Sequence, residues 1–266
     1  MKLKTCSPLN VLVSNDGEFN EVEDELLQEE ALQLRINRRD FTMTMRTPGA
    51  DSYLVRGLLH SEGMNWLYSN YREEDTPNGT LVNIDLDCST DAHSSKRRLA
   101  STSSCGLCGK KDLSSLFPEI TPIQRGFVLM PSLITSCYSI LKKRQELFSR
   151  TGCSHAAAAF TVKAELLCAF EDIGRHNAVD KVIGCLLEKE QLQDADLLVV
   201  SSRLSYEIVH KCARAGIPVL AGVSAPSSLA VNMAQKLGIT MAAFCRGKRA
   251  AFYSNLHRLA LAPQVQ

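Results

Sequence analysis

Residues 197–244 read LLVVSSRLSYEIVHKCARAGIPVLAGVSAPSSLAVNMAQKLGITMAAF, and this segment determines which class of fold the chain adopts. Short apolar runs alternate in it with longer segments of mixed polarity. The apolar runs are 197–201, 219–223 and 239–244, and the segments between them are 206–215 and 228–237. Short buried strands separated by helices of about ten residues indicate a sheet with a parallel portion that helices cover. We therefore predict an α/β fold.

The chain around this segment divides into two portions. Before the division we expect alternating strands around a turn, then a helix and a further strand, at 31–48 (turn at 37–40), 53–63 and 81–86. After it we expect a helix, a strand and a helix, at 131–148, 166–170 and 178–189. We predict a smaller, mainly β N-terminal portion over 1–104 that ends in a flexible loop, and an α/β domain over 105–266.

Composition places the chain among ordinary globular proteins. It has 266 residues, of which 45% are hydrophobic and 22% are charged. Lys plus Arg number 30 and Asp plus Glu number 29, so bulk charge gives no reason to expect a nucleic-acid partner. The first twenty residues lack a signal-peptide core, and no apolar run is long enough to span a bilayer. We expect a cytoplasmic protein without a membrane partner.

Ten cysteines are many for such a chain, and two of them stand apart. Cys105 and Cys108 lie in SSCGLCG, residues 103–109, after a polar run with few apolar residues. Thiolates on so flexible a backbone suit disulfide exchange, metal ligation or carriage of sulfur as a persulfide. We expect residues 88–111 to form a mobile arm that carries Cys105. Five other cysteines lie in apolar runs and are predicted to be buried: Cys137, Cys168, Cys185, Cys212 and Cys245.

Polar residues gather where three predicted strands give way to helices. The junctions are 171–181, with His176 and Asn177 in the first helical turn, 201–205 and 224–228. The carboxyl ends of strands in open α/β sheets form ligand crevices, and helix N-termini favour anions. Helix capping explains each junction taken singly, but together they indicate a pocket for a ligand that bears oxyanions. A basic turn follows the last strand, at Arg246, Lys248 and Arg249, and such a turn can close on phosphate groups.

Several of these segments occur in a family-specific order: MRTPG at 45–49, LLHSEG at 58–63, SCGLCG at 104–109, SRLSYE at 202–207, AGIPV at 215–219, SAPSSLA at 224–230 and FCRGKR at 244–249. In this the chain resembles the formate dehydrogenase accessory sulfurtransferase family, the bacterial FdhD proteins. The resemblance implies a cytidine-deaminase-like three-layer α/β domain and a homodimer. It also implies a sulfur carrier that takes persulfide sulfur from a cysteine desulfurase. The sulfur then passes to the molybdenum cofactor before that cofactor enters formate dehydrogenase.

The resemblance also assigns residues. Cys105 and Cys108 correspond to the family's cysteine pair, with Cys105 as the persulfide carrier. The segment for the cofactor, bis-molybdopterin guanine dinucleotide, corresponds to Phe244, Cys245, Arg246, Gly247, Lys248 and Arg249. We expect the junction at His176 and Asn177 to share in holding the guanine-nucleotide part, which guanosine diphosphate would mimic. No permanently bound metal is expected.

Other functions are compatible with the cysteine pair alone. A zinc site needs about four ligands, which Cys153 and His155 could complete with the pair, but Ser104 stands where zinc deaminases have the proline of their Pro-Cys-x-x-Cys segment. A thioredoxin-like oxidoreductase would carry its pair at a strand-to-helix turn, not after a long polar loop. A binding chaperone that transfers no sulfur is a further alternative. Cys108 either releases the sulfur by forming a disulfide with Cys105 or only assists, and both remain open at this point.

Overall fold

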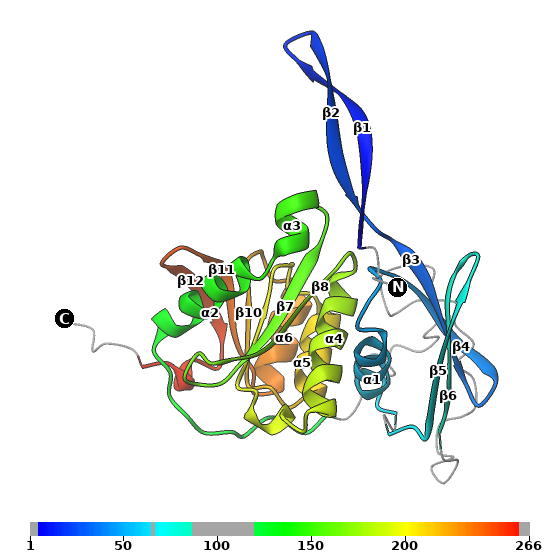
Figure 1. Ribbon diagram of the computed structural model, residues 1–266. Helices are drawn as coiled ribbons and strands as arrows, with labels where there is room; N and C mark the ends of the chain where they lie inside the picture. The colour runs from blue at the N-terminus through cyan, green and yellow to red at the C-terminus, as the bar shows by residue number, and fades with distance from the viewer. Residues whose placement is uncertain (1–4, 65–66, 87–119, 261–266) are drawn as a thin grey trace.

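A six-stranded sheet lies at the centre of the larger part of the molecule (Figure 1). The computed structural model describes residues 5–64, 67–86 and 120–260. The sheet has the order β12-β11-β10-β9-β7-β8, with β7 at His155–Phe160, β8 at Leu166–Asp172, β9 at Leu197–Val200, β10 at Val219–Gly222, β11 at Thr240–Arg246 and β12 at Arg249–Ser254. Strands β9, β10 and β11 are parallel, which confirms the predicted parallel portion. Strand β7 runs antiparallel to both of its neighbours, and β12 runs antiparallel to β11.

Helices cover both faces of this sheet. One face packs against α4 (Arg175–Glu188), α5 (Tyr206–Arg214) and α6 (Ser228–Lys236), and the other against α2 (Pro131–Lys143). Successive strand residues point to opposite faces, so Ala157 packs in the core under α4–α6 while Ala158 packs in the core under α2. Short 3₁₀ turns occur at Leu192–Asp194 and Leu256–Arg258. These three layers confirm the predicted α/β fold class.

The N-terminal part contains a four-stranded sheet and one helix. The sheet has the order β4-β3-β6-β5, with β3 at Glu30–Ile36, β4 at Arg39–Arg46, β5 at Asn70–Thr76 and β6 at Gly79–Asp85. Its buried face packs on α1 (Asp51–Ser61), mainly through Leu34, Val82 and Leu54. The turn between β3 and β4 was predicted. It is formed by Asn37 (φ 50°) and Arg38 (φ 62°), and positive φ at both central residues suits the twist of a two-residue hairpin.

The two parts of the molecule pack through α1 and α4, which lie side by side in Figure 1. Glycines allow the two helix backbones to touch. A Cβ at Gly57 would overlap the carbonyl of Asp180, and a Cβ at Gly184 would overlap the carbonyl of Tyr53. This contact fixes the N-terminal sheet against the α/β domain. The predicted boundary between residues 104 and 105 lies outside the described residues.

A long hairpin projects from the N-terminal part (Figure 1). It consists of β1 (Cys6–Asn15) and β2 (Glu18–Leu27), which pair only with each other. Asp16 (φ 49°) and Gly17 (φ 93°) form its turn. Sequence analysis assigned no element here.

One predicted helix is divided in the structure. The helix expected over 131–148 ends at Lys143, and a separate helix, α3, runs over Glu146–Thr151. The Glu171 carboxylate accepts hydrogen bonds from the backbone N–H groups of Leu147 and Phe148, both at 2.8 Å. It thereby satisfies donors at the start of the new helix and fixes the change in direction.

Candidate functional site

The sheet topology brings the predicted junctions to one edge. Because β7 is antiparallel to both β8 and β9, the strands β8, β9, β10 and β11 all point the same way. Their carboxyl ends and the start of β7 therefore form a common edge, as expected for a ligand crevice in an open α/β sheet. Neighbouring strands are about 4.8 Å apart, so the four steps from β8 to β11 separate the ends of this edge by roughly 19 Å. His176 lies at one end of the edge and the basic turn at the other.

Asp172 is the centre of the junction between β8 and α4. Its side chain is fully buried and accepts hydrogen bonds from Thr47 N (3.2 Å), Gly174 N (2.8 Å), Asn177 Nδ2 (3.1 Å) and Lys181 Nζ (2.7 Å). Lys181 Nζ also donates to Thr47 O at 2.8 Å. Burial raises the pKa of Asp172, and the charge of Lys181 opposes part of that rise. The MRTPG segment is thus tied to the junction through Thr47.

Asn177 belongs to the same network. Its side-chain nitrogen donates to Met45 O at 2.7 Å as well as to Asp172, and its oxygen accepts from Thr44 at 3.3 Å. The residue is buried, and its amide hydrogens are used within the protein. In this structure Asn177 positions the turn, and its predicted contact with a cofactor stays a prediction.

A second buried ion pair holds the LLHSEG segment against α4. Asp180 on α4 accepts from Ser61 Oγ at 2.9 Å and from Lys211 Nζ on α5 at 2.7 Å. His60 contacts Arg214 O at 3.0 Å through Nε2. These contacts join α1, α4 and α5, so this segment supports the helices that follow the edge.

Three residues with basic side chains lie near one another beside the junction. His155 begins β7, Arg175 begins α4 and Arg203 follows β9. Burial lowers the pKa of His155, and the positive charges of Arg175 and Arg203 lower it further. Nearby, His176 Nε2 lies 4.0 Å from Glu207 Oε2. The sequence predicted only His176 as a site residue here, because placing His155 beside Arg175 requires the register of β7, which the sequence did not reveal.

Two polar atoms of this edge lack a partner among the described residues. They are Arg175 Nε and Ser205 Oγ, and both are buried. An unsatisfied buried donor costs about 1–3 kcal/mol, so an oxygen-bearing ligand bonded there would be stabilising. Two other hydroxyls of the edge have structural partners: Ser201 Oγ accepts from Ala156 N at 2.9 Å, and Ser227 Oγ caps α6 through Ala230 N at 3.2 Å. Capping therefore explains Ser227 but not Ser205.

The basic turn joins β11 to β12. Arg246, Gly247, Lys248 and Arg249 are all exposed, whereas Cys245 is fully buried. Arg246 and Arg249 are paired across the strands, an arrangement that like charges destabilise. Phe244 has φ 53°, a strained value for a bulky side chain, and its N–H donates to Ser224 O at 3.3 Å. Three cations that form no ion pair with the described residues, in a turn next to a strained Phe244, favour an anionic ligand.

Of the cysteines within the described residues, Cys153 is exposed and the others are buried. Cys105 and Cys108, with the predicted arm at 88–111, lie outside the described residues. The five cysteines predicted to be buried are buried, and burial raises the pKa of Cys137 to about 12 and that of Cys245 to about 11. Cys153 is the exposed thiol of the described segments. No cluster of three or more His, Cys, Asp or Glu side chains placed to hold a metal occurs in those segments.

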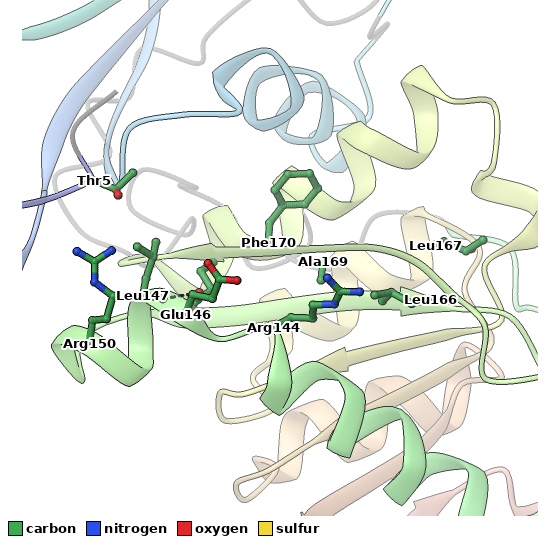
Figure 2. Close-up of a pocket in the computed structure, with 10 residues that line it drawn as sticks. Thr5, Arg144, Glu146, Leu147, Arg150, Leu166, Leu167, Ala169 and Phe170 are labelled. Atoms are coloured by element: carbon green, nitrogen blue, oxygen red, sulfur yellow. Dashed lines mark hydrogen bonds between the residues drawn. The ribbon is translucent and has the colours of Figure 1, made fainter. Parts of the chain in front are cut away.

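A hollow of about 540 Å³ lies between α3 and β8 (Figure 2). Leu147, Leu166 and Ala169 contribute apolar surface, and Arg144, Arg150, Glu146 and Glu171 contribute charge. The ring of Phe170 lies on the opposite face of β8, against Tyr53 of α1 (Figure 2). Arg150 is paired with Glu25 of the hairpin at 2.6 Å. No helix within the described ranges is long and apolar enough to cross a membrane.

Comparison with known proteins identifies the family. The profile of the FdhD/NarQ family matches residues 27–260. The chain belongs to this family. Among its FdhD relatives, the sulfur carrier protein FdhD of Streptomyces avermitilis is 39% identical over 279 residues, which cover 94% of each chain. That of Nocardia farcinica is 40% identical over 252 residues, which cover 89% of this chain and 88% of the relative.

The fold is also similar to that of a solved structure. A crystal structure of a protein from Desulfotalea psychrophila superposes with a TM-score of 0.76 at 23% identity, covering 96% of this chain and all of that one. The FdhD/NarQ profile begins at Leu27, so almost all of the β1–β2 hairpin precedes the matched part.

Proposed function

We propose that this protein is a sulfur carrier that loads Cys105 with persulfide sulfur from a cysteine desulfurase. The sulfur passes to bis-molybdopterin guanine dinucleotide, the molybdenum cofactor, before insertion into formate dehydrogenase. We place this reaction in the cytoplasm and assign it to a homodimer. The support is family membership together with relatives named sulfur carriers, and a cysteine pair that no buried structural role explains.

The loading step needs no external oxidant or reductant. The Cys105 thiolate attacks the outer sulfur of the donor's persulfide, an S–S bond forms at Cys105, and the donor cysteine leaves as a thiolate. On delivery, the sulfane sulfur takes up two electrons to become sulfide. Either the acceptor supplies them, or Cys108 attacks Cys105 to form a disulfide, which a thiol reductant then resets. The first path returns Cys105 directly to the thiolate.

The strand-end edge is where we place the cofactor. Its phosphates carry negative charge, and the edge offers Arg175 and Arg203 at one end and Arg246 and Arg249 at the other. Arginine forks bind phosphate oxygens in pairs, which fixes orientation as well as charge. The observation that carries this assignment is the unpartnered Arg175 Nε and Ser205 Oγ at the same edge.

The test compares two cysteines by mass spectrometry and by activity. After incubation with a cysteine desulfurase and cysteine, the intact chain should gain the mass of one sulfur atom, located on Cys105. Cys105→Ala should fold normally, gain no sulfur, and leave formate dehydrogenase inactive in a strain that lacks the native protein. Cys153→Ala, which removes an exposed thiol, is the matched control and should support full activity. If Cys105→Ala restores the enzyme, the carrier assignment is wrong and a binding chaperone is left.

A further inference from the structure

The β1–β2 hairpin has two chemically different faces. Residues opposite each other in the register share a face, so Val11 and Val22 lie together, with Leu9 and Leu26 on the same side. Leu9, Val22 and Leu26 are 49%, 46% and 45% exposed. This face also carries Asp24 and Glu18 near its two ends. The reverse face carries three glutamates, Glu21, Glu23 and Glu25, together with the exposed Leu12 and Phe19. A two-stranded hairpin is marginally stable by itself in water, so an uncovered apolar face of this length indicates a docking surface.

The hairpin is held at its base. Glu25 accepts two hydrogen bonds from Arg150 on α3, from Nε and from a terminal nitrogen, each at 2.6 Å. Gln28 N also donates to Thr5 O at 2.8 Å. These contacts fix the starting direction of the hairpin beside α3. Pro8 lies within β1, and prolines in strands are typical of edges that do not accept another strand. The hairpin is therefore suited to docking by its face.

The charge of the hairpin differs from that of the remaining chain. Residues 5–27 hold six of the 29 acidic residues and none of the 30 basic ones, so the rest has seven more basic than acidic residues. Two hairpins packed against each other would bring twelve negative charges together. A hairpin laid on the body of a second copy would instead meet a surface of opposite net charge.

The hollow beside α3 combines apolar and charged side chains. Leu147, Leu166 and Ala169 contribute apolar side chains, and Arg144, Arg150, Glu146 and Glu171 contribute charges of both signs (Figure 2). Arg150 is paired with Glu25 of its own hairpin. Thr5, the residue before β1, also lines it, so hairpin and hollow are adjacent on one molecule. A two-fold axis that passes beside this region would place each hairpin over the hollow of the other copy.

We propose that two copies of this chain exchange hairpins, each laying its apolar face over the hollow between α3 and β8 of the other. The proposal rests on the proposed function only for the existence of a dimer. A face about 34 Å long and 10 Å wide offers roughly 340 Å², from strands of ten residues each. One docked hairpin would bury about 700 Å² in total, and two would bury about 1,400 Å². Stable interfaces bury about 1,200–2,000 Å², so reciprocal exchange reaches this range and docking on a single unrelated protein does not.

The experiment measures the mass of the full-length protein in solution across a dilution series. The wild type should be a dimer, and Leu9→Ser with Val22→Ser should raise its dissociation constant at least a hundredfold. The matched control is Leu12→Ser, which alters a more exposed apolar residue on the opposite face and should leave the constant unchanged. Arg144→Glu should weaken the dimer without altering the hairpin. Far-ultraviolet circular dichroism establishes that each variant is folded.

Each alternative result has a defined meaning. A monomeric wild type, or a Leu9→Ser with Val22→Ser dimer as tight as the wild type, overturns the proposal. A double variant that stays dimeric but no longer binds the desulfurase also overturns it, and assigns the hairpin to that partner. Sulfur loading separates this inference from the proposed function, because Cys105→Ala should remain dimeric while it loses sulfur transfer.

Discussion

The two ends of the strand edge use polar residues in opposite ways. At the β8–α4 junction, Asp172 and Lys181 are 0% and 2% exposed and hydrogen-bond within the protein. At the β11–β12 turn, Arg246 and Arg249 are exposed and oppose each other, next to the strained Phe244. Both sites follow an apolar strand and look alike in sequence. The difference shows that polar residues at a strand end either hold the edge together or stay available for a ligand.

The largest expected effect comes from breaking the buried pair. Lys181→Met should lower the free energy of unfolding by about 3–5 kcal/mol, because it leaves the Asp172 carboxylate buried without its counter-charge. Urea unfolding monitored by circular dichroism measures the change, with the slope against urea expected to stay constant.

Two controls sharpen this result. The double variant Lys181→Met with Asp172→Asn removes the unpaired buried charge. It should therefore recover part of the lost free energy of unfolding. Lys248→Met, in the exposed turn, should change stability by no more than about 0.5 kcal/mol. Equal losses in Lys181→Met and Lys248→Met would contradict the distinction between the two ends.

The next effect concerns binding. Replacing both Arg246 and Arg249 with Ala should weaken binding of guanosine diphosphate more than tenfold, about 1.4 kcal/mol, with little change in unfolding. Titration calorimetry measures the affinity. The paired Arg→Lys variant keeps the charge and removes the planar fork, so an intermediate affinity would show that the fork contributes. Unchanged affinity in the Ala variant would place the nucleotide elsewhere.

Local patterns predicted much of the fold. The alternation over 197–244 gave the parallel strands and their helices, and the turn at Asn37 and Arg38 was found because its chemistry is local. Strand β7, HAAAAF, was missed because alanine has no strand preference and the run is buried between helices on both faces. The break between α2 and α3 was missed because its cap, Glu171, comes from a distant strand.

The positions of the candidate site residues in the fold were predicted where those positions depend on neighbouring sequence. The basic turn and His176 follow strands within a few residues, so sequence placed them at strand ends. The contacts of Asn177 with Met45 and Thr44 cross more than a hundred residues and were not foreseeable from the first turn of a helix. The cluster of His155, Arg175 and Arg203 was not foreseeable for the same reason, because it depends on how β7 pairs with β8 and β9.

The smallest expected effect tests that cluster. The pKa of His155 should lie below its ordinary value because of burial and the charges of Arg175 and Arg203, with Asp172 acting in the opposite direction. An unfolded histidine titrates near about 6.5, so between the two values the unfolded chain binds more protons than the folded one. Stability should therefore fall as pH drops from about 6.5 through the folded pKa, and His155 should contribute no pH dependence above about 6.5. His60 has the same sign, since burial lowers its pKa too.

Proton NMR of the histidine ring separates these contributions. Arg203→Ala should raise the pKa of His155 and leave that of His60 unchanged. Guanosine diphosphate should raise the His155 pKa only if its phosphates occupy this end of the edge, because a bound anion offsets the two arginine charges. A His155 pKa that does not respond to Arg203→Ala would show that the three side chains do not form one electrostatic unit. The junction end of the edge would then be purely structural, and anion binding would fall to the basic turn alone.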